Sequence, residues 1–99
     1  MSDTYRLDEN NQPVPCELHD WALWFERCDR HVALDKIDNV KVSTVFLGLD
    51  HSFDCTPGHV PVLWETMIFG GEHDGYQDRY TSHDAAVAGH QVALALVKA

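Results

Sequence analysis

Residues 40–49, Val-Lys-Val-Ser-Thr-Val-Phe-Leu-Gly-Leu, decide the fold, because they begin as a strand and are apolar on both faces by their end. This pattern is typical of a central strand that is covered on at least one side. Residues 31–37 give a strand pattern just before it, and Asp38-Asn39 tolerate the positive φ angles of a tight hairpin turn. After a polar stretch at 50–61, residues 62–69 give the next strand, followed by a short one near Arg79-Tyr80. The middle of the chain is therefore predicted to form an antiparallel sheet.

Two segments have a helical period instead. Between residues 17 and 28, apolar residues recur on one helix face, namely Leu18, Trp21, Ala22, Phe25 and Cys28. Residues 85–97 are rich in Ala, Leu and Val, and Thr81 or Ser82 can cap this second helix. A glycine inside a helix costs about 1 kcal/mol relative to alanine, so Gly89 predicts a close approach to the sheet.

With a short strand around residues 4–7, the predicted fold is α+β. It has one antiparallel sheet of about four to five strands and two helices, in the order β-α-β-β-β-β-α. A chain of 99 residues suits one domain, which takes in the whole of 1–99. Both helices are expected to lie on one sheet and to bury a common core of Trp21, Phe25, Phe46, Trp64, Ile68 and Val92.

The charge balance excludes some classes of partner. Sixteen acidic residues against seven basic ones give a formal net charge of −9. A nucleic-acid-binding protein needs clustered Lys and Arg, and so does a protein that docks on an anionic membrane. The sequence has neither a spanning apolar stretch nor a secretion signal at its start, so a cytoplasmic protein is expected.

The cysteines favour the same reducing compartment. Cys16, Cys28 and Cys55 are odd in number and too sparse to staple a small secreted domain, so free thiols are predicted. Two CxxH pairs, Cys16 with His19 and Cys28 with His31, suggest a zinc site. A continuous helix between the two cysteines separates them by about 18 Å, however, and one metal ion does not bridge that distance.

A second histidine-rich group lies in the polar stretch before the strand at 62–69. It contains His51, Asp54, Cys55 and His59. A loop can wrap around a metal ion, but these residues do not have the spacing of a structural zinc site. A hydrated loop or one that contacts a partner is the favoured interpretation, so no metal and no cofactor are predicted.

An acid–base pair at the end of the central strands is the alternative to a binding function. Asp50 and His51 follow one strand, and Glu65 lies on the neighbouring one. A carboxylate beside an imidazole can act as a general acid and base. As a small enzyme or ligand-binding domain, the protein would use Asp50, His51 and Glu65 together. This requires Glu65 to lie opposite residues 47–49, and only one of several possible strand registers places it there. His90, on the mostly apolar second helix, is expected to be a packing residue with its hydrogen bonds satisfied.

Three motifs together resemble a family of small uncharacterised proteins encoded by tailed bacteriophages and prophages. They are residues 42–51 (Val-Ser-Thr-Val-Phe-Leu-Gly-Leu-Asp-His), residues 65–71 (Glu-Thr-Met-Ile-Phe-Gly-Gly), and Arg79-Tyr-Thr81 before Ala88-Gly-His90. The resemblance implies an accessory protein that acts in the cytoplasm of the bacterial host. It transfers no catalytic residues.

A binding function is therefore expected, with a host or phage protein as the partner; a homo-oligomer is left open. Inhibition of a host defence or nucleic-acid-handling complex is one such role. An acidic surface suits a basic partner through charge complementarity. We expect the rigid sheet to present the polar stretch 50–61 and the turn 70–76 together. The predicted partner-binding residues there are Asp50, His51, Asp54, Glu72, His73, Asp74 and Tyr76.

Overall fold

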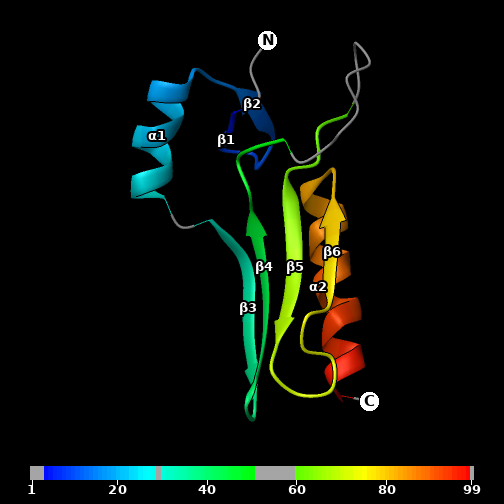
Figure 1. Cartoon of the computed structure of the whole chain (residues 1–99). Helices are drawn as coiled ribbons and strands as arrows, with labels where there is room; N and C mark the ends of the chain where they lie inside the picture. The colour runs from blue at the N-terminus through cyan, green and yellow to red at the C-terminus, as the bar shows by residue number, and fades with distance from the viewer. Residues whose placement is uncertain (1–3, 29, 51–59, 99) are drawn as a thin grey trace.

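The computed structural model describes residues 4–28, 30–50 and 60–98. Its elements are β1 Tyr5–Leu7, β2 Pro13–Pro15, α1 Leu18–Arg27, β3 His31–Ile37, β4 Val40–Phe46, β5 Trp64–Phe69, β6 Gln77–Tyr80 and α2 His83–Lys98. They form a four-stranded main sheet, a separate β1–β2 pair and two helices (Figure 1). The α+β class is confirmed. Strand β2 was not predicted; its prolines are tolerated because both strands of a two-stranded sheet are edges.

The main sheet is an antiparallel meander in the order β3-β4-β5-β6. The predicted turn closes the first hairpin, where Ile37 pairs with Val40 and Asp38 has a φ of 53°. In the next pair of strands, Phe46 lies opposite Trp64. Because alternate residues of a strand point to opposite faces, the sheet has one face towards α2 and one face away from it.

Helix α2 covers the first of these faces (Figure 1). The residues of β4 and β5 that face it are completely buried, namely Val42, Thr44, Phe46, Trp64, Thr66 and Ile68. The Ser82 hydroxyl accepts the N–H of Ala85 at 3.1 Å and so caps the helix as predicted. The predicted close approach of Gly89 is also confirmed, because a Cβ added there would lie 2.1 Å from the Tyr80 hydroxyl oxygen. No helix in the described part of the chain is long and apolar enough to span a bilayer.

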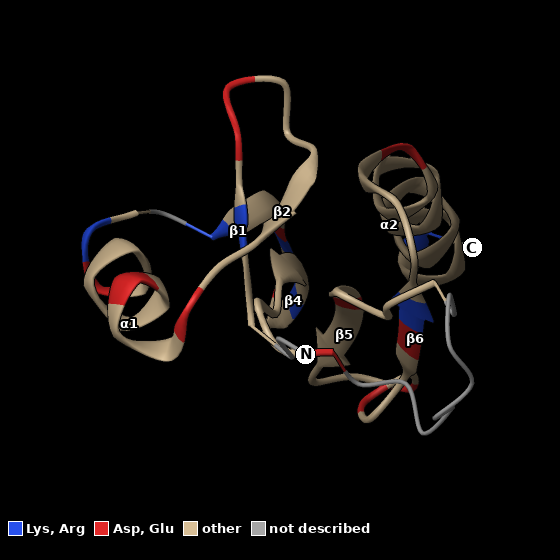
Figure 2. Ribbon diagram, turned by 90° about the horizontal axis from the view of Figure 1, so that it is seen from above, with Lys and Arg blue, Asp and Glu red and all other residues tan. Residues whose placement is uncertain are grey.

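The prediction that both helices lie on one sheet is wrong. Helix α1 packs along β1 and does not lie along any strand of the main sheet. Figure 2 shows the two helices at opposite sides of the molecule. Trp21 and Phe25 are half-buried, and both lie next to Gly48. Strand β1 packs beside the Phe46 ring where α1 was expected, and α1 reaches that ring only through Trp24, with ring centroids 5.8 Å apart.

Val92 is also misplaced in the predicted core, since it is 57% exposed. The buried residues of α2 include Ala86, His90, Ala93 and Leu94. Val92 follows His90 by two residues, a rotation of about 200° around the helix, and therefore points to the opposite side.

Candidate functional site

The first group of predicted partner-binding residues lies between β4 and β5. A carboxylate oxygen of Asp50 accepts the N–H of Val62 at 3.0 Å, just before β5 begins. This hydrogen bond fixes the two ends of the intervening stretch close together. His51 and Asp54, which belong to the same prediction, lie outside the described residues.

The second group lies in the turn after β5. Glu72, His73 and Asp74 are in this turn, and Asp74 accepts the N–H of Gly70 at 2.7 Å. Tyr76 packs against the core, and this burial, with a smaller effect from the charge of Asp78, raises the pKa of its hydroxyl.

The two groups do not come together. One precedes β5 and the other follows it, so the length of this six-residue strand, about 20 Å, separates them. Successive connections of an antiparallel meander lie at opposite ends of the sheet. The prediction that the sheet presents Asp50 beside Glu72, His73 and Asp74 is therefore wrong.

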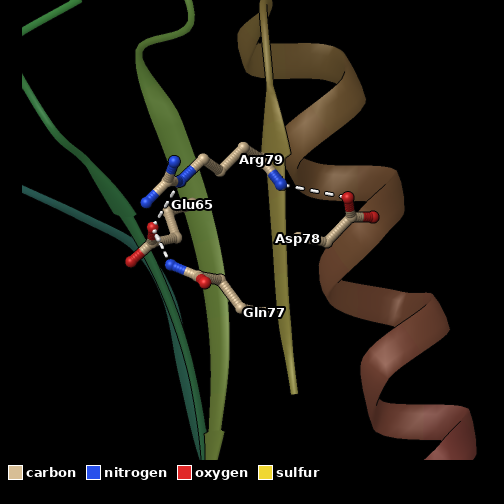
Figure 3. Close-up of polar contacts among 4 residues, drawn as sticks. All are labelled: Glu65, Gln77, Asp78 and Arg79. Atoms are coloured by element: carbon tan, nitrogen blue, oxygen red, sulfur yellow. Dashed lines mark hydrogen bonds and ion pairs between the residues drawn. The ribbon is translucent and has the colours of Figure 1, made fainter. Parts of the chain in front are cut away.

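Glu65 does not meet Asp50 either. The register places Glu65 opposite Val45, and not opposite residues 47–49 as the acid–base alternative required. One oxygen of its carboxylate accepts hydrogen bonds from the Gln77 side chain at 2.6 Å and from Nε of Arg79 at 2.9 Å (Figure 3). The carboxylate of Glu65 is thus bound by two side chains of β6 and not by Asp50.

A buried hydrogen-bonded chain crosses the interface between α2 and the sheet. Nδ1 of His90 lies 2.7 Å from the Thr44 hydroxyl, which in turn contacts the Thr66 hydroxyl, and Nε2 lies 2.7 Å from a carboxylate oxygen of Asp35. A carboxylate only accepts, so Nε2 donates to Asp35. In the neutral ring, Nδ1 then accepts the Thr44 hydroxyl hydrogen. His90 is thus the satisfied packing residue that was predicted.

The order carboxylate, imidazole, hydroxyl is also that of a nucleophilic triad. Thr44 is completely buried beneath α2, however, and no substrate reaches its oxygen while the helix is in place. The hydrogen-bonded chain of Asp35, His90, Thr44 and Thr66 separates two apolar clusters, one around Phe46 and Trp64 and the other around Val42 and Ile68. Its role in this geometry is to hold α2 in register on the sheet.

The face of the main sheet that points away from α2 carries apolar and charged side chains together. None of the described helices or strands packs on it, and we call it the uncovered face. Its side chains stand in three rows across the strands: His31, Val45, Glu65 and Arg79; Leu34, Ser43, Met67 and Gln77; Lys36, Lys41 and Phe69. Leu34 and Phe69 are 47% and 42% exposed.

The charge of the uncovered face is opposite to that of the whole chain. It holds Lys36, Lys41 and Arg79, three of the seven basic residues, and only one acidic residue, Glu65, which is paired with Arg79. Lys36 and Lys41 are direct neighbours across β3 and β4 and form no ion pair with any described residue. The ammonium group of Lys41 lies 4.8 Å from the centre of the Phe69 ring. Acidic segments lie on α1, in the β1–β2 loop and at the start of α2 (Figure 2).

This face was not predicted from the sequence. The signal was present in the apolar residues Leu34, Met67 and Phe69, which alternate with the residues that face α2. Only the register shows that they share a face with the unpaired lysines.

Comparison of the chain with known protein families, with curated proteins and with solved structures finds no match in any of the three.

Proposed function

We propose that this protein acts by binding a macromolecular partner, and that the uncovered face holds one amphipathic helix of a partner protein. The observation that carries the proposal is the presence of half-exposed apolar side chains beside unpaired lysines on that face. Exposed apolar residues surrounded by polar ones are typical of interaction sites. A sheet usually buries such residues against another layer of structure.

The dimensions of the uncovered face favour a single helix. Four strands spaced about 4.8 Å apart, with three rows of side chains, give an area of about 15 by 14 Å. A helix with its side chains is about 10–12 Å across, so one helix fits. A standard protein interface buries roughly 800 Å² on each partner, which is more than this face offers. A short segment is therefore a better occupant than the broad surface of a folded domain.

The lysines define the chemistry of that helix. Carboxylates flanking its apolar stripe pair with Lys36 and Lys41 while its aliphatic residues pack on Leu34, Met67 and Phe69. A nucleic acid fits less well, because a chain of net charge −9 repels a polyanion as it approaches. A second copy bound face to face fits less well too, because each copy brings three basic residues and only one acidic residue, Glu65, to this face.

The phage-like motifs support a host or phage protein as the source of the helix, and the bacterial cytoplasm as the place of binding. Occupying an amphipathic helix denies it to its other partners. This supports an accessory protein that inhibits a host complex, such as one concerned with defence or nucleic-acid handling.

Selection of random peptides on the immobilised full-length protein tests the proposal. We expect the recovered peptides to be helical, with Asp or Glu beside a stripe of Leu or Ile. Lys36→Glu with Lys41→Glu should weaken their binding about tenfold or more, because two attractive pairs become repulsive. Lys98→Glu, which makes one such charge reversal on α2, should leave binding unchanged.

Three results contradict the proposal. The first is recovery of basic peptides whose binding is insensitive to the two lysines. The second is tighter binding of oligothymidine than of the selected peptides. The third is a concentration-dependent dimer, seen by sedimentation, that the Lys36→Glu and Lys41→Glu protein fails to form.

A further inference from the structure

A pocket lies between the turn after β5 and the last turn of α2. Figure 1 shows these two segments at the same end of the main sheet. The pocket is lined by Val40, Gly70, Glu72, His73, Leu96 and Val97. Three of these residues give it aliphatic walls, and two give it titratable groups. The pocket is independent of the uncovered face, because Leu96 and Val97 belong to the helix on the other side of the sheet.

The end of α2 makes the pocket electronegative. Helix α2 ends at Lys98, so Leu96 and Val97 are in its last turn. The last four carbonyl groups of a helix have no partner within the helix, and this end carries about half a negative charge. Lys98 is exposed and does not line the pocket.

Two carboxylates add to this negative charge. Glu72 lines the pocket directly. Asp74 lies close to it, because its carboxylate holds the N–H of Gly70, another lining residue, at 2.7 Å. No Lys or Arg is among the described lining residues.

From this combination we infer that the pocket binds an alkyl cation, either the side chain of a Lys or Arg residue or a free aliphatic amine. The aliphatic part packs on Val40, Leu96 and Val97, as the stems of Lys and Arg pack on apolar surfaces. The cationic head meets Glu72 and the carbonyl groups at the end of α2. Both an acidic residue and apolar walls are needed for this ligand, and the pocket supplies both.

Titration of the ¹⁵N-labelled full chain tests the inference by NMR. The probes are n-butylammonium, a blocked Gly-Arg-Gly peptide and, as the neutral equivalent, n-butanol. We expect the two cations to shift the amide signals of Gly70, His73 and Val97, with a Kd of about 10 mM for the amine, a value in keeping with its few non-hydrogen atoms. Tighter binding of the peptide identifies a protein side chain as the ligand, and tighter binding of the amine identifies a free amine.

Glu72→Gln should weaken binding of both cations at least fivefold. The control is Asp78→Asn on β6, which removes the same charge away from the pocket and should leave binding unchanged. Equal binding of n-butanol, equal loss in both variants, or no saturable shift with either cation would each overturn the inference.

Discussion

Replacing Gly89 by alanine tests the packing of α2 on the sheet. In an unhindered helix this change stabilises the protein by about 1 kcal/mol. Here the added Cβ would lie 2.1 Å from the Tyr80 hydroxyl oxygen and 2.2 Å from Cζ of the same ring. Non-bonded atoms prefer separations of about 3.5–4.0 Å, so the overlap exceeds 1 Å. Tyr80 is only 9% exposed, so moving its ring away would disturb the core around it.

Overpacking of this kind costs about 1–3 kcal/mol, and the size of the overlap favours the upper end. After subtracting the gain in helix propensity, we expect Gly89→Ala to lower the free energy of unfolding by about 2 kcal/mol. Urea unfolding followed by circular dichroism measures it. Ala88→Gly, at an exposed position of the same helix, gives the propensity effect alone, about 1 kcal/mol.

A double variant separates the overlap from other effects. Tyr80→Leu removes the ring atoms that the new methyl group would meet. In that background, Gly89→Ala should become stabilising by up to about 1 kcal/mol. A stabilising Gly89→Ala in the otherwise unchanged protein would refute the close approach of α2 to β6.

Three further predictions concern the core. Thr44→Val should lower the free energy of unfolding by about 1–3 kcal/mol, because it leaves buried polar atoms of His90 and Thr66 without a partner. If the variant and the unchanged protein unfold at the same urea concentration, these hydrogen bonds are dispensable. Phe46→Ala should cost about 3–5 kcal/mol, and an unshifted thermal transition would contradict the central position of this ring. Burial raises the pKa of Tyr80 above 10.0, and the Thr66 hydroxyl opposes part of the rise. The unfolded chain therefore loses this proton first, so the free energy of unfolding should fall as the pH rises above 10. Tyr80→Phe should reduce that fall in unfolding curves measured at alkaline pH.

The main sheet was largely predictable because its signals are local. Asp38-Asn39 marked the first hairpin, and the period of residues 40–46 marked its second strand. Gly89 indicated a close contact, because a glycine in the middle of a helix lowers its stability and is expected where a neighbouring element leaves no room for a side chain. Each of these inferences used residues close together in the sequence.

The position of α1 was not predictable in the same way. The stripe around Trp21 and Phe25 shows that one side of the helix is covered, but it does not say by what. Strand β1 and Gly48 provide the cover, while the main sheet was the expected one. The hydrogen bonds from Asp35 through His90 to Thr44 were not predictable for a related reason, since they join residues as many as 55 positions apart in the sequence.

The candidate site depended on register. The prediction that the sheet presents Asp50 together with Glu72, His73 and Asp74 was wrong, because the two connections leave opposite ends of β5. The uncovered face is defined by a register that places Lys36 beside Lys41 and Lys41 beside Phe69. Sequence spacing alone allows several registers.

Site-specific photo-crosslinking tests the uncovered face most directly as the binding surface. Benzoylphenylalanine is placed at Ser43, in the middle row of that face, or at the exposed Gln91 of α2, and each protein is irradiated with the selected acidic peptide. We expect a crosslink from position 43 that is lost with Lys36→Glu and Lys41→Glu, and none from position 91. A crosslink from position 91 with none from position 43 would contradict it.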